Sequence, residues 1–207
     1  ESFATWASVL SQSESTRWTE AWTTFAVSEK LWALRQDQLP STHPISADIR
    51  DLDDVQVNFD GITYAKGASV LKQLVAWVGR DEFLAGVRAY FAEHAWGNTE
   101  LSDLFAHLEK TSGRDLSAWG EQWLQTAGVN TLRPVVELDG DGAYASVTIL
   151  QSAADDHPTL REHRIAVGLY DHAPDGIVRR RRVEVDVRGE RTDVPELEGE
   201  QQPDLPL

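Results

Sequence analysis

The stretch WLQTAGVNTLRPVVELDGDGAYASVTIL, residues 123–150, contains the change of hydrophobic period that decides the fold. Before Gly128, apolar residues recur every three or four positions, which is typical of amphipathic helices. After it, Val135–Leu138 leads into the turn sequence Asp139–Gly142 and then into an alternating run, Tyr144–Leu150. Two such runs around a glycine-rich turn indicate a β-hairpin. The chain therefore changes from helices to strands near Gly128.

Upstream of this change, apolar spacing predicts about six helices. The apolar positions fall within Phe3–Leu10, Trp18–Trp32, Val70–Val78, Phe83–Phe91, Leu101–Leu108 and Leu116–Leu124. For the fifth of these helices, Asn98 or Thr99 is the expected N-cap and Gly113 the expected end.

Downstream, Arg164–Tyr170, Ile177–Val187 and Arg191–Leu197 indicate three further strands and hence a small antiparallel β-sandwich. An open set of five strands leaves a bare edge, so we expect this sandwich to be incomplete at its C-terminus. The segment Glu196–Leu207, rich in Glu, Gln and Pro, has the composition of a linker or a truncated loop.

The predicted fold class is thus α+β, with two domains. A helical domain takes up residues 1–128, and the β-sandwich takes up residues 129–207.

The amino-acid composition excludes several classes of protein and of functional site. The chain has 207 residues with 41% hydrophobic residues and eight Trp, which is enough for a real core. It has no Cys, which excludes a disulfide framework, a thiol nucleophile and a Cys-ligated metal. It also has no Met, so we expect it to be part of a longer polypeptide. The lack of a signal-like segment and of Cys favours a cytoplasmic location.

The net charge of −15 makes nucleic acids and anionic membranes poor partners, because a non-specific polyanion binder needs a basic surface. The exception is a run of four arginines, Arg179–Arg182. In a strand, alternate members point to opposite faces, so this run predicts two small basic spots and not a phosphate cradle.

Two residues are candidates for chemistry. Tyr64 carries a phenol with a pKa of about 10, which keeps its proton at pH 7 and can donate a hydrogen bond to a developing oxyanion. The alternative is that Tyr64 is a core residue, on one helical stripe with Ala68. Glu1 lies on a small, semi-polar helix face, and its alternative role is a favourable charge at a helix N-terminus. Gly67 leaves room for another backbone to approach.

The six histidines offer no obvious metal site, because no two of them have the spacing of ligands on one helix. Each is expected to be a surface or capping residue; they are His43, His94, His107, His157, His163 and His172. The sequence has no H-E-x-x-H motif and no phosphate-binding glycine loop.

Several motifs resemble those of zinc aminopeptidases of the aminopeptidase N (gluzincin) family. Glu1–Ala4 is similar to the segment N-E-[GS]-F-A, Ser41–Ile45 to S-[ST]-H-P-[IL], and Phe59–Ala68 to F-D-x-I-x-Y-x-K-G-A. Asn98-Thr99 with Leu104, and Trp119 through Trp123 before Gly128, follow in the family's order. The resemblance covers residues 1–128 well. It covers residues 129–207 only by order, since a β-sandwich follows the catalytic domain in this family.

The resemblance implies a zinc-dependent removal of N-terminal residues from peptides. Glu1 matches the third zinc ligand, and Tyr64 matches the residue that stabilises the oxyanion. The two zinc-binding His and the general-base Glu of H-E-x-x-H would lie upstream, so the implied partners are peptide substrates and the rest of the parent polypeptide. By itself the chain is expected to be inactive. Ser2 stands where Gly is commoner in the family.

The alternative function is a non-catalytic interaction module, built from helices and a sandwich and derived from the same family. The presence or absence of H-E-x-x-H in the parent polypeptide distinguishes the two.

Overall fold

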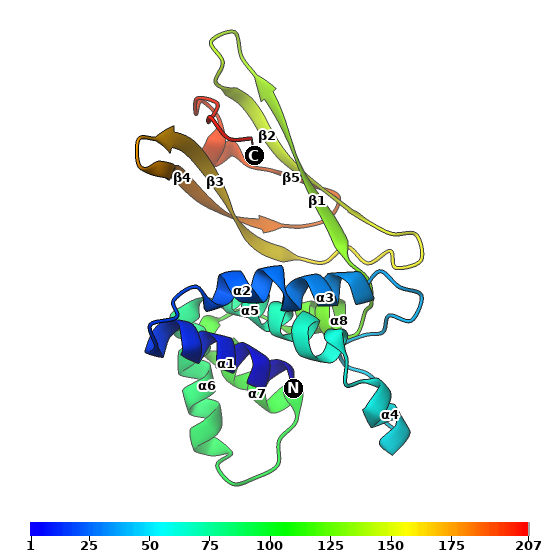
Figure 1. The fold of residues 1–207 in the computed structure, drawn as a ribbon. Coiled ribbons are helices and arrows are strands. Elements are labelled where there is room, and N and C mark those ends of the chain that lie inside the picture. Colours follow the sequence, from blue (N-terminus) through cyan, green and yellow to red (C-terminus); the bar gives the residue numbers. More distant parts are fainter. Residues whose placement is uncertain (207) are drawn as a thin grey trace. The chain divides into compact units, whose positions relative to one another are not determined.

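The computed structural model describes residues 1–206. It divides the chain into two compact units, Glu1–Val129, here called the helical unit, and Asn130–Leu207, here called the sheet unit (Figure 1). The first unit is built of helices and the second mainly of antiparallel strands. The predicted α+β class is therefore confirmed.

The helical unit contains more helices than the apolar spacing predicts. They are α1 Ser2–Ser15, α2 Ala21–Val27, α3 Glu29–Gln36, α4 Leu52–Val57, the π-helix η1 Ile62–Lys66, α5 Gly67–Val78, α6 Arg80–Glu93, α7 Leu101–Ser112 and α8 Ser117–Leu124 (Figure 1).

The predicted single helix over Trp18–Trp32 is wrong, because α2 and α3 are separate. The hydroxyl of Ser28 donates to the carbonyl oxygen of Thr24 at 2.8 Å, a local bond that competes with continuation of the helix. The short helix α4 was not predicted, since its apolar ends Leu52 and Val57 are 81% and 70% exposed and form no buried stripe.

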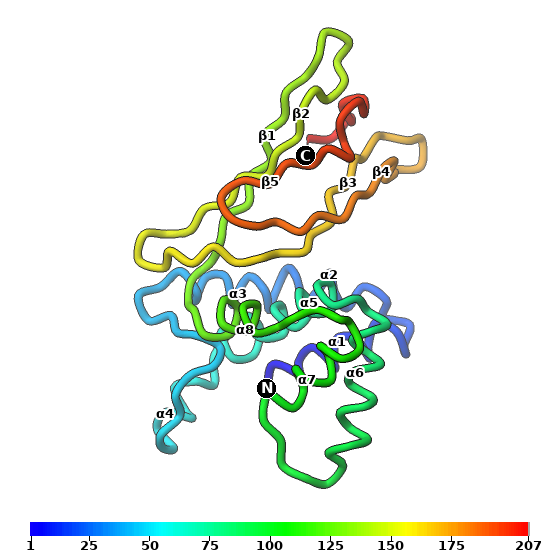
Figure 2. Tube along the Cα trace, turned by 180° about the vertical axis from the view of Figure 1, so that it is seen from behind, coloured from blue at the N-terminus to red at the C-terminus, as the bar shows by residue number. Residues whose placement is uncertain are grey.

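The core of the helical unit lies between α1, α5, α6, α7 and α8. Leu74 of α5, Phe83 of α6 and Leu108 of α7 are almost completely buried there. The ring of Trp6 from α1 meets that of Phe83 edge-on, with centroids 5.0 Å apart. Figure 2 shows these helices from behind, with α6 and α7 joined by a loop at the bottom of the view. This packing fixes the start of α1 against the start of α5.

The ends of α7 test the capping expectations. Gly113 ends the helix in the left-handed conformation with φ of 69°, as predicted. The N-cap is Glu100, and neither Asn98 nor Thr99. Its backbone N–H donates to the Asp103 carboxylate at 2.8 Å, and its side chain accepts from the backbone N–H of Asp103. This reciprocal capping box gives both backbone N–H groups a hydrogen-bond partner.

The sheet unit holds two antiparallel sheets. One has the order β1-β2-β5, with β1 Asn130–Leu138, β2 Tyr144–Ala153 and β5 Arg191–Asp193. The other pairs β3 His163–Ala173 with β4 Gly176–Val187. The predicted hairpin is confirmed, since β1 and β2 pair around the turn with Val136 opposite Val147. Apolar residues from both sheets form one core cluster.

The last predicted strand is shorter than expected. After β5, residues Pro195–Leu197 form a 3-10 helix, η2. Leu197 is fully buried in the core. Beyond it, the backbone N–H of Tyr144 donates to the Glu200 carbonyl oxygen at 2.9 Å, and that of Leu205 donates to the Tyr170 carbonyl oxygen at 3.1 Å. The expectation of a linker is therefore wrong for residues 196–205, which belong to the sheet unit.

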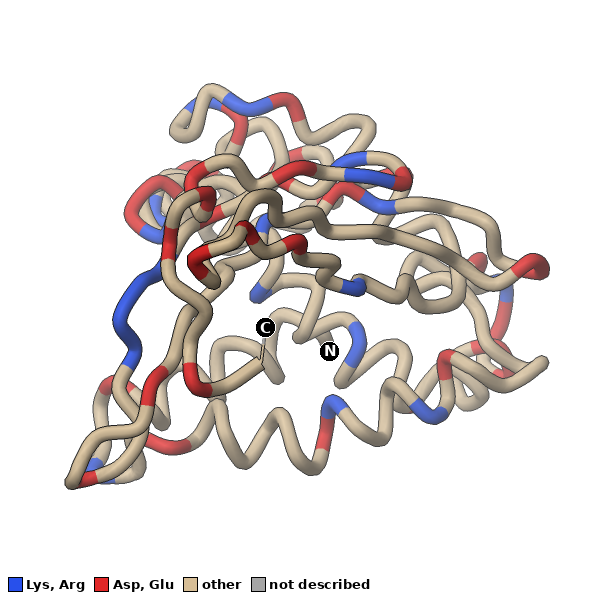
Figure 3. The backbone as a smooth tube through the Cα atoms, turned by 90° about the horizontal axis from the view of Figure 1, so that it is seen from above, with Lys and Arg blue, Asp and Glu red and all other residues tan. Residues whose placement is uncertain are grey.

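The four arginines Arg179–Arg182 lie on β4 and form an uninterrupted blue stretch in Figure 3. Three of them contact acidic side chains. Arg180 lies 2.7 Å from Asp171, Arg181 lies 3.5 Å from Glu200, and Arg182 lies 2.7 Å from Glu184. The basic run is thus largely neutralised by nearby carboxylates.

None of the helices in residues 1–206 is long and apolar enough to cross a lipid bilayer.

Candidate active site

The first turn of α1 packs against the π-helix η1 and the start of α5. The Ser2 hydroxyl donates a hydrogen bond of 2.7 Å to the carbonyl oxygen of Thr63 in η1. A Cβ atom at Gly67 would lie 2.0 Å from the Ser2 hydroxyl oxygen, so only glycine permits this approach. The neighbouring segment is the start of α1, but the close contacts come from the Ser2 side chain and not from its backbone, since the Ser2 Cα would lie 3.5 Å away.

This packing brings Glu1 and Tyr64 together. Glu1 is the exposed N-cap residue of α1, and Tyr64 lies half-buried in the middle of η1. The pKa of Tyr64 is raised above its ordinary value of 10, first by the burial of the phenol, then by the charge of the Glu1 carboxylate and the hydrogen bond that the phenol donates to it. Tyr64 is therefore a protonated donor at neutral pH, and it is not a closed core residue.

The N-terminal end of η1 is held by Asp60. Its carboxylate accepts hydrogen bonds of 3.0 Å from the backbone N–H groups of Ile62 and Thr63. The Nε2 atom of His43 lies 2.8 Å from the same carboxylate, and the other ring nitrogen lies 2.8 Å from the Pro44 carbonyl oxygen. His43 thus braces the residue that caps the helix of Tyr64.

Gln36 completes this arrangement from α3. Its side-chain oxygen accepts from the backbone N–H of Gly61 at 2.8 Å, and its amide nitrogen donates to Asp60. Asp60 and His43 belong to the motifs quoted from the sequence, but their joint role was missed. No local pattern marks it, because it joins residues 17 positions apart.

The C-terminal end of η1 is held by a buried ion pair. The ammonium group of Lys66 lies 2.8 Å from Asp37, and it also donates to the Gly128 carbonyl oxygen at 3.3 Å. Tyr64 therefore sits in a π-helix fixed at both ends, a helix type that occurs mostly as single turns and often at functional sites.

An apolar cavity of about 220 Å³ adjoins this arrangement. Ser2 and Gly67, which form the contact between α1 and α5, line it together with apolar side chains such as Phe3, Leu71 and Phe105. The apolar cavity thus begins at Ser2, the residue that follows Glu1, whereas Glu1 and Tyr64 do not line it.

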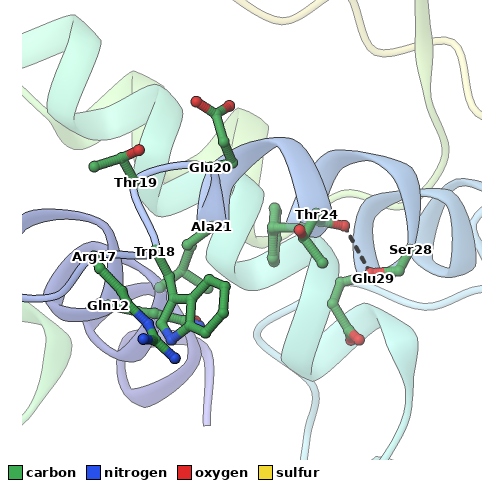
Figure 4. A pocket seen from close by; sticks show the side chains of 11 residues that line it. Gln12, Arg17, Trp18, Thr19, Glu20, Ala21, Thr24, Ser28 and Glu29 are labelled. Atoms are coloured by element: carbon green, nitrogen blue, oxygen red, sulfur yellow. Dashed lines mark hydrogen bonds between the residues drawn. The ribbon is translucent and has the colours of Figure 1, made fainter.

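A second cavity, of about 330 Å³, lies at the junction of α1 and α2 and is shown in Figure 4. The guanidinium of Arg17 lies over the ring of Trp18 at 4.5 Å. The carboxylates of Glu20 and Glu29 point away from one another (Figure 4), so they do not form an acid–base pair. This cavity offers no catalytic arrangement comparable to that of Glu1 and Tyr64.

Comparison with known proteins identifies the family. The model of the peptidase family M1 domain matches residues 1–123. The chain is 59% identical to aminopeptidase N of Streptomyces lividans over 98% of its own length and 25% of that protein. It is 39% identical to the tricorn protease-interacting factor F2 of Thermoplasma volcanium over 72% of its length and 18% of that protein.

A third relative is aminopeptidase 2 of Candida albicans, 33% identical over 69% of the chain and 15% of that protein. The chain thus spans a quarter or less of the length of these relatives. The match to the family model covers more than half of the chain and includes both Glu1 and Tyr64. The chain therefore belongs to peptidase family M1.

Proposed function

We propose that this chain is part of a zinc-dependent aminopeptidase, in which Glu1 is a zinc ligand and Tyr64 stabilises the oxyanion. The observation that carries the proposal is the hydrogen bond and charge interaction between these two residues, 63 positions apart in the sequence, at the start of α1 and in η1. The family membership and the names of two relatives, aminopeptidase N and aminopeptidase 2, support it.

The residues present are compatible with zinc. Glu1 has an exposed carboxylate, which is a ligand type that zinc accepts. The neighbouring phenol of Tyr64 is neutral, so it does not repel a metal cation. When bound, zinc supplies Lewis-acid polarisation of the scissile carbonyl group and activation of water. Catalytic zinc sites usually have three protein ligands. Glu1 would be one of them.

Tyr64 acts on the peptide carbonyl group. Its phenol keeps its proton at neutral pH, and the fixed ends of η1 hold it in one place. A donor that is already oriented stabilises the negative charge on the carbonyl oxygen without rearranging during the reaction. Asp60, His43 and Lys66 act only through the position of Tyr64.

The helical unit is, on this proposal, the C-terminal part of the catalytic domain, and the sheet unit is the β-sandwich that follows it. The substrates are peptides with a free N-terminus. The sequence contains no H-E-x-x-H, so the other zinc ligands and the general base come from other parts of the parent polypeptide. The 207-residue chain alone should therefore show no hydrolysis of aminoacyl amides.

Steady-state kinetics of the intact parent enzyme test the proposal. Tyr64→Phe should lower kcat by roughly 10²–10³, the usual loss when one oxyanion donor is removed, while the zinc content stays unchanged. Tyr170→Phe is the matched control, because Tyr170 is an exposed tyrosine of the sheet unit, and it should leave kcat unchanged. A near-wild-type rate for Tyr64→Phe would exclude Tyr64 from the mechanism.

A further inference from the structure

Three potential metal ligands meet at the junction of α6 and α7. They are Glu93 at the end of α6, His94 directly after it, and His107 in α7, and one ligand atom from each lies within 4.8 Å of the others. The Nε2 atom of His107 is 3.5 Å from a carboxylate oxygen of Glu93. His94 stands at the C-cap position of α6, in line with the expected capping role. The expectation of a surface or capping residue is wrong for His107, which lies inside α7 with a side chain only 12% exposed. The two rings come from adjacent helices, so helical spacing cannot reveal them.

Close packing of α6 and α7 creates this meeting point. A Cβ atom at Gly86 of α6 would lie 2.8 Å from the Leu108 side chain and 3.2 Å from the His107 carbonyl oxygen. The hydroxyl of Thr111 in α7 donates to the Glu82 carbonyl oxygen of α6 at 2.9 Å. These contacts hold α6 and α7 together beside His107, independently of any metal.

Aromatic contacts orient the two imidazoles. The rings of His94 and His107 are nearly perpendicular, with centroids 5.6 Å apart. The ring of Tyr90 lies 5.4 Å from that of His94 and 6.1 Å from that of His107. The Tyr90 hydroxyl is itself hydrogen-bonded to that of Thr99 at 2.6 Å, which ties the loop between the helices to α6.

We propose that Glu93, His94 and His107 bind a zinc ion. Two imidazoles and one carboxylate are the donor set of many three-ligand zinc sites, and zinc accepts both donor types. Ligand atoms around a tetrahedral zinc ion lie roughly 3.4 Å apart, given bond lengths of about 2.1 Å. The distance of 3.5 Å between the Glu93 carboxylate oxygen and the His107 Nε2 atom is close to this value.

Burial favours the same conclusion. The His107 side chain is only 12% exposed, whereas the Glu93 side chain is 69% exposed and has room to move toward the ion. A metal here would cross-link the end of α6 to α7. Binding to the folded chain alone would then stabilise the helical unit. None of the three ligands takes part in the proposed function.

Calorimetric titration of the metal-free 207-residue chain with zinc chloride tests the site. We expect one strong site. Replacing a ligand in Glu93→Gln or His94→Asn should weaken zinc binding on the order of tenfold or more, since lost ligand contacts act at least as strongly as lost outer-shell contacts. Cobalt(II) should give visible absorption bands in the wild type that both variants lose.

Two controls make the result specific. His172→Asn removes an exposed histidine of the sheet unit and should leave zinc binding unchanged. Glu1→Gln should also leave the strong site in place, which separates this inference from the proposed function. His107→Asn changes a largely buried residue and would disturb the packing of α7 as well as the metal site. The test of zinc binding therefore uses Glu93→Gln and His94→Asn. Unchanged zinc affinity in both of these would overturn the proposal, as would loss of the strong site in Glu1→Gln or His172→Asn.

Discussion

The ammonium group of Lys66 lies 2.8 Å from a carboxylate oxygen of Asp37, and the two side chains are only 9% and 3% exposed. Asp37 also accepts a hydrogen bond of 3.0 Å from the backbone N–H of Gly128, whose carbonyl oxygen in turn accepts from Lys66. One ion pair therefore joins the end of α3, the π-helix of Tyr64 and the segment after α8. Its loss should affect the whole helical unit.

We predict that Asp37→Ala destabilises the helical unit by about 3–5 kcal/mol, because it leaves the Lys66 charge buried without its carboxylate. Urea unfolding followed by Trp fluorescence measures this, since all eight Trp lie in residues 1–129. The control is Arg80→Ala, which breaks the exposed Arg80–Glu14 pair and should cost at most about 1 kcal/mol. Equal effects of the two variants would contradict the prediction.

Local signals explain what the sequence predicts correctly. The helices over α1, α5, α6, α7 and α8 were predicted because apolar spacing and a glycine stop such as Gly113 act within a few residues. The break at Ser28 and the helix α4 depend on single side chains and exposed positions that leave no periodic pattern. The expectation of a linker from Glu196 onward was wrong, because Leu197 is fully buried and tertiary packing, not composition, decides this.

For the candidate site as well, local sequence signals predicted single residues but not the contacts between them. Glu1 and Tyr64 were singled out through their motifs, but only the fold places them together. The bracing of Asp60 by His43, and the meeting of His94 with His107, join residues from different elements. Such pairs follow from the packing of helices, which spacing along a single helix does not describe.

Glu1 should control the titration of Tyr64. The pKa of Tyr64 is raised by burial, by the Glu1 charge and by the hydrogen bond to Glu1. Glu1→Gln removes the charge, so the midpoint should move to lower pH while remaining above the ordinary value because burial persists. The change is measured by NMR of ¹³C-labelled tyrosine rings in the 207-residue chain.

Tyr64→Phe assigns the Tyr64 signal in this experiment, and Glu14→Gln serves as the matched loss of a carboxylate at the far end of α1. The Tyr64 midpoint should be the same in Glu14→Gln as in the wild type. A midpoint that does not respond to Glu1→Gln would show that the two side chains do not interact in solution.

His163 should make the sheet unit sensitive to acid. Burial, followed by the charge of Arg161, lowers the pKa of His163 from 6.5 to about 4. The unfolded chain therefore takes up a proton as the pH falls below 6.5, while the folded unit does so only near pH 4. Stability is thus lost as the pH falls through this window, by about 2 kcal/mol at pH 5 for this group.

Hydrogen exchange of the β3 and β4 amides at pH 7 and pH 5 measures this loss in the sheet unit. In His163→Asn the difference in stability between the two pH values should shrink by the stated amount. His157→Asn, which removes a half-buried histidine of the same unit, should retain the wild-type difference. An unchanged difference in His163→Asn would argue against a neutral, buried His163.

Substitutions of Gly67 and Ser2 should have non-additive effects on the free energy of unfolding in a double-mutant cycle. A Cβ atom at Gly67 would meet the Ser2 hydroxyl at 2.0 Å and its Cβ at 2.6 Å, but the Ser2 Cα only at 3.5 Å, which is an ordinary contact. Gly67→Ala should therefore cost about 1–3 kcal/mol in the wild type through overpacking. It should cost clearly less in a Ser2→Gly background, where the clashing atoms are gone.

Urea unfolding of the four chains gives the coupling free energy, and Gly97→Ala is the control, since its new Cβ would meet no atom closer than 3.4 Å. In the parent enzyme, Gly67→Ala should also lower kcat, because pushing α1 away from η1 separates Glu1 from Tyr64. Ser2→Gly should restore part of that rate. Additive effects on stability would mean that α1 and α5 do not approach this closely, and the proposed geometry of Glu1 and Tyr64 would lose its support.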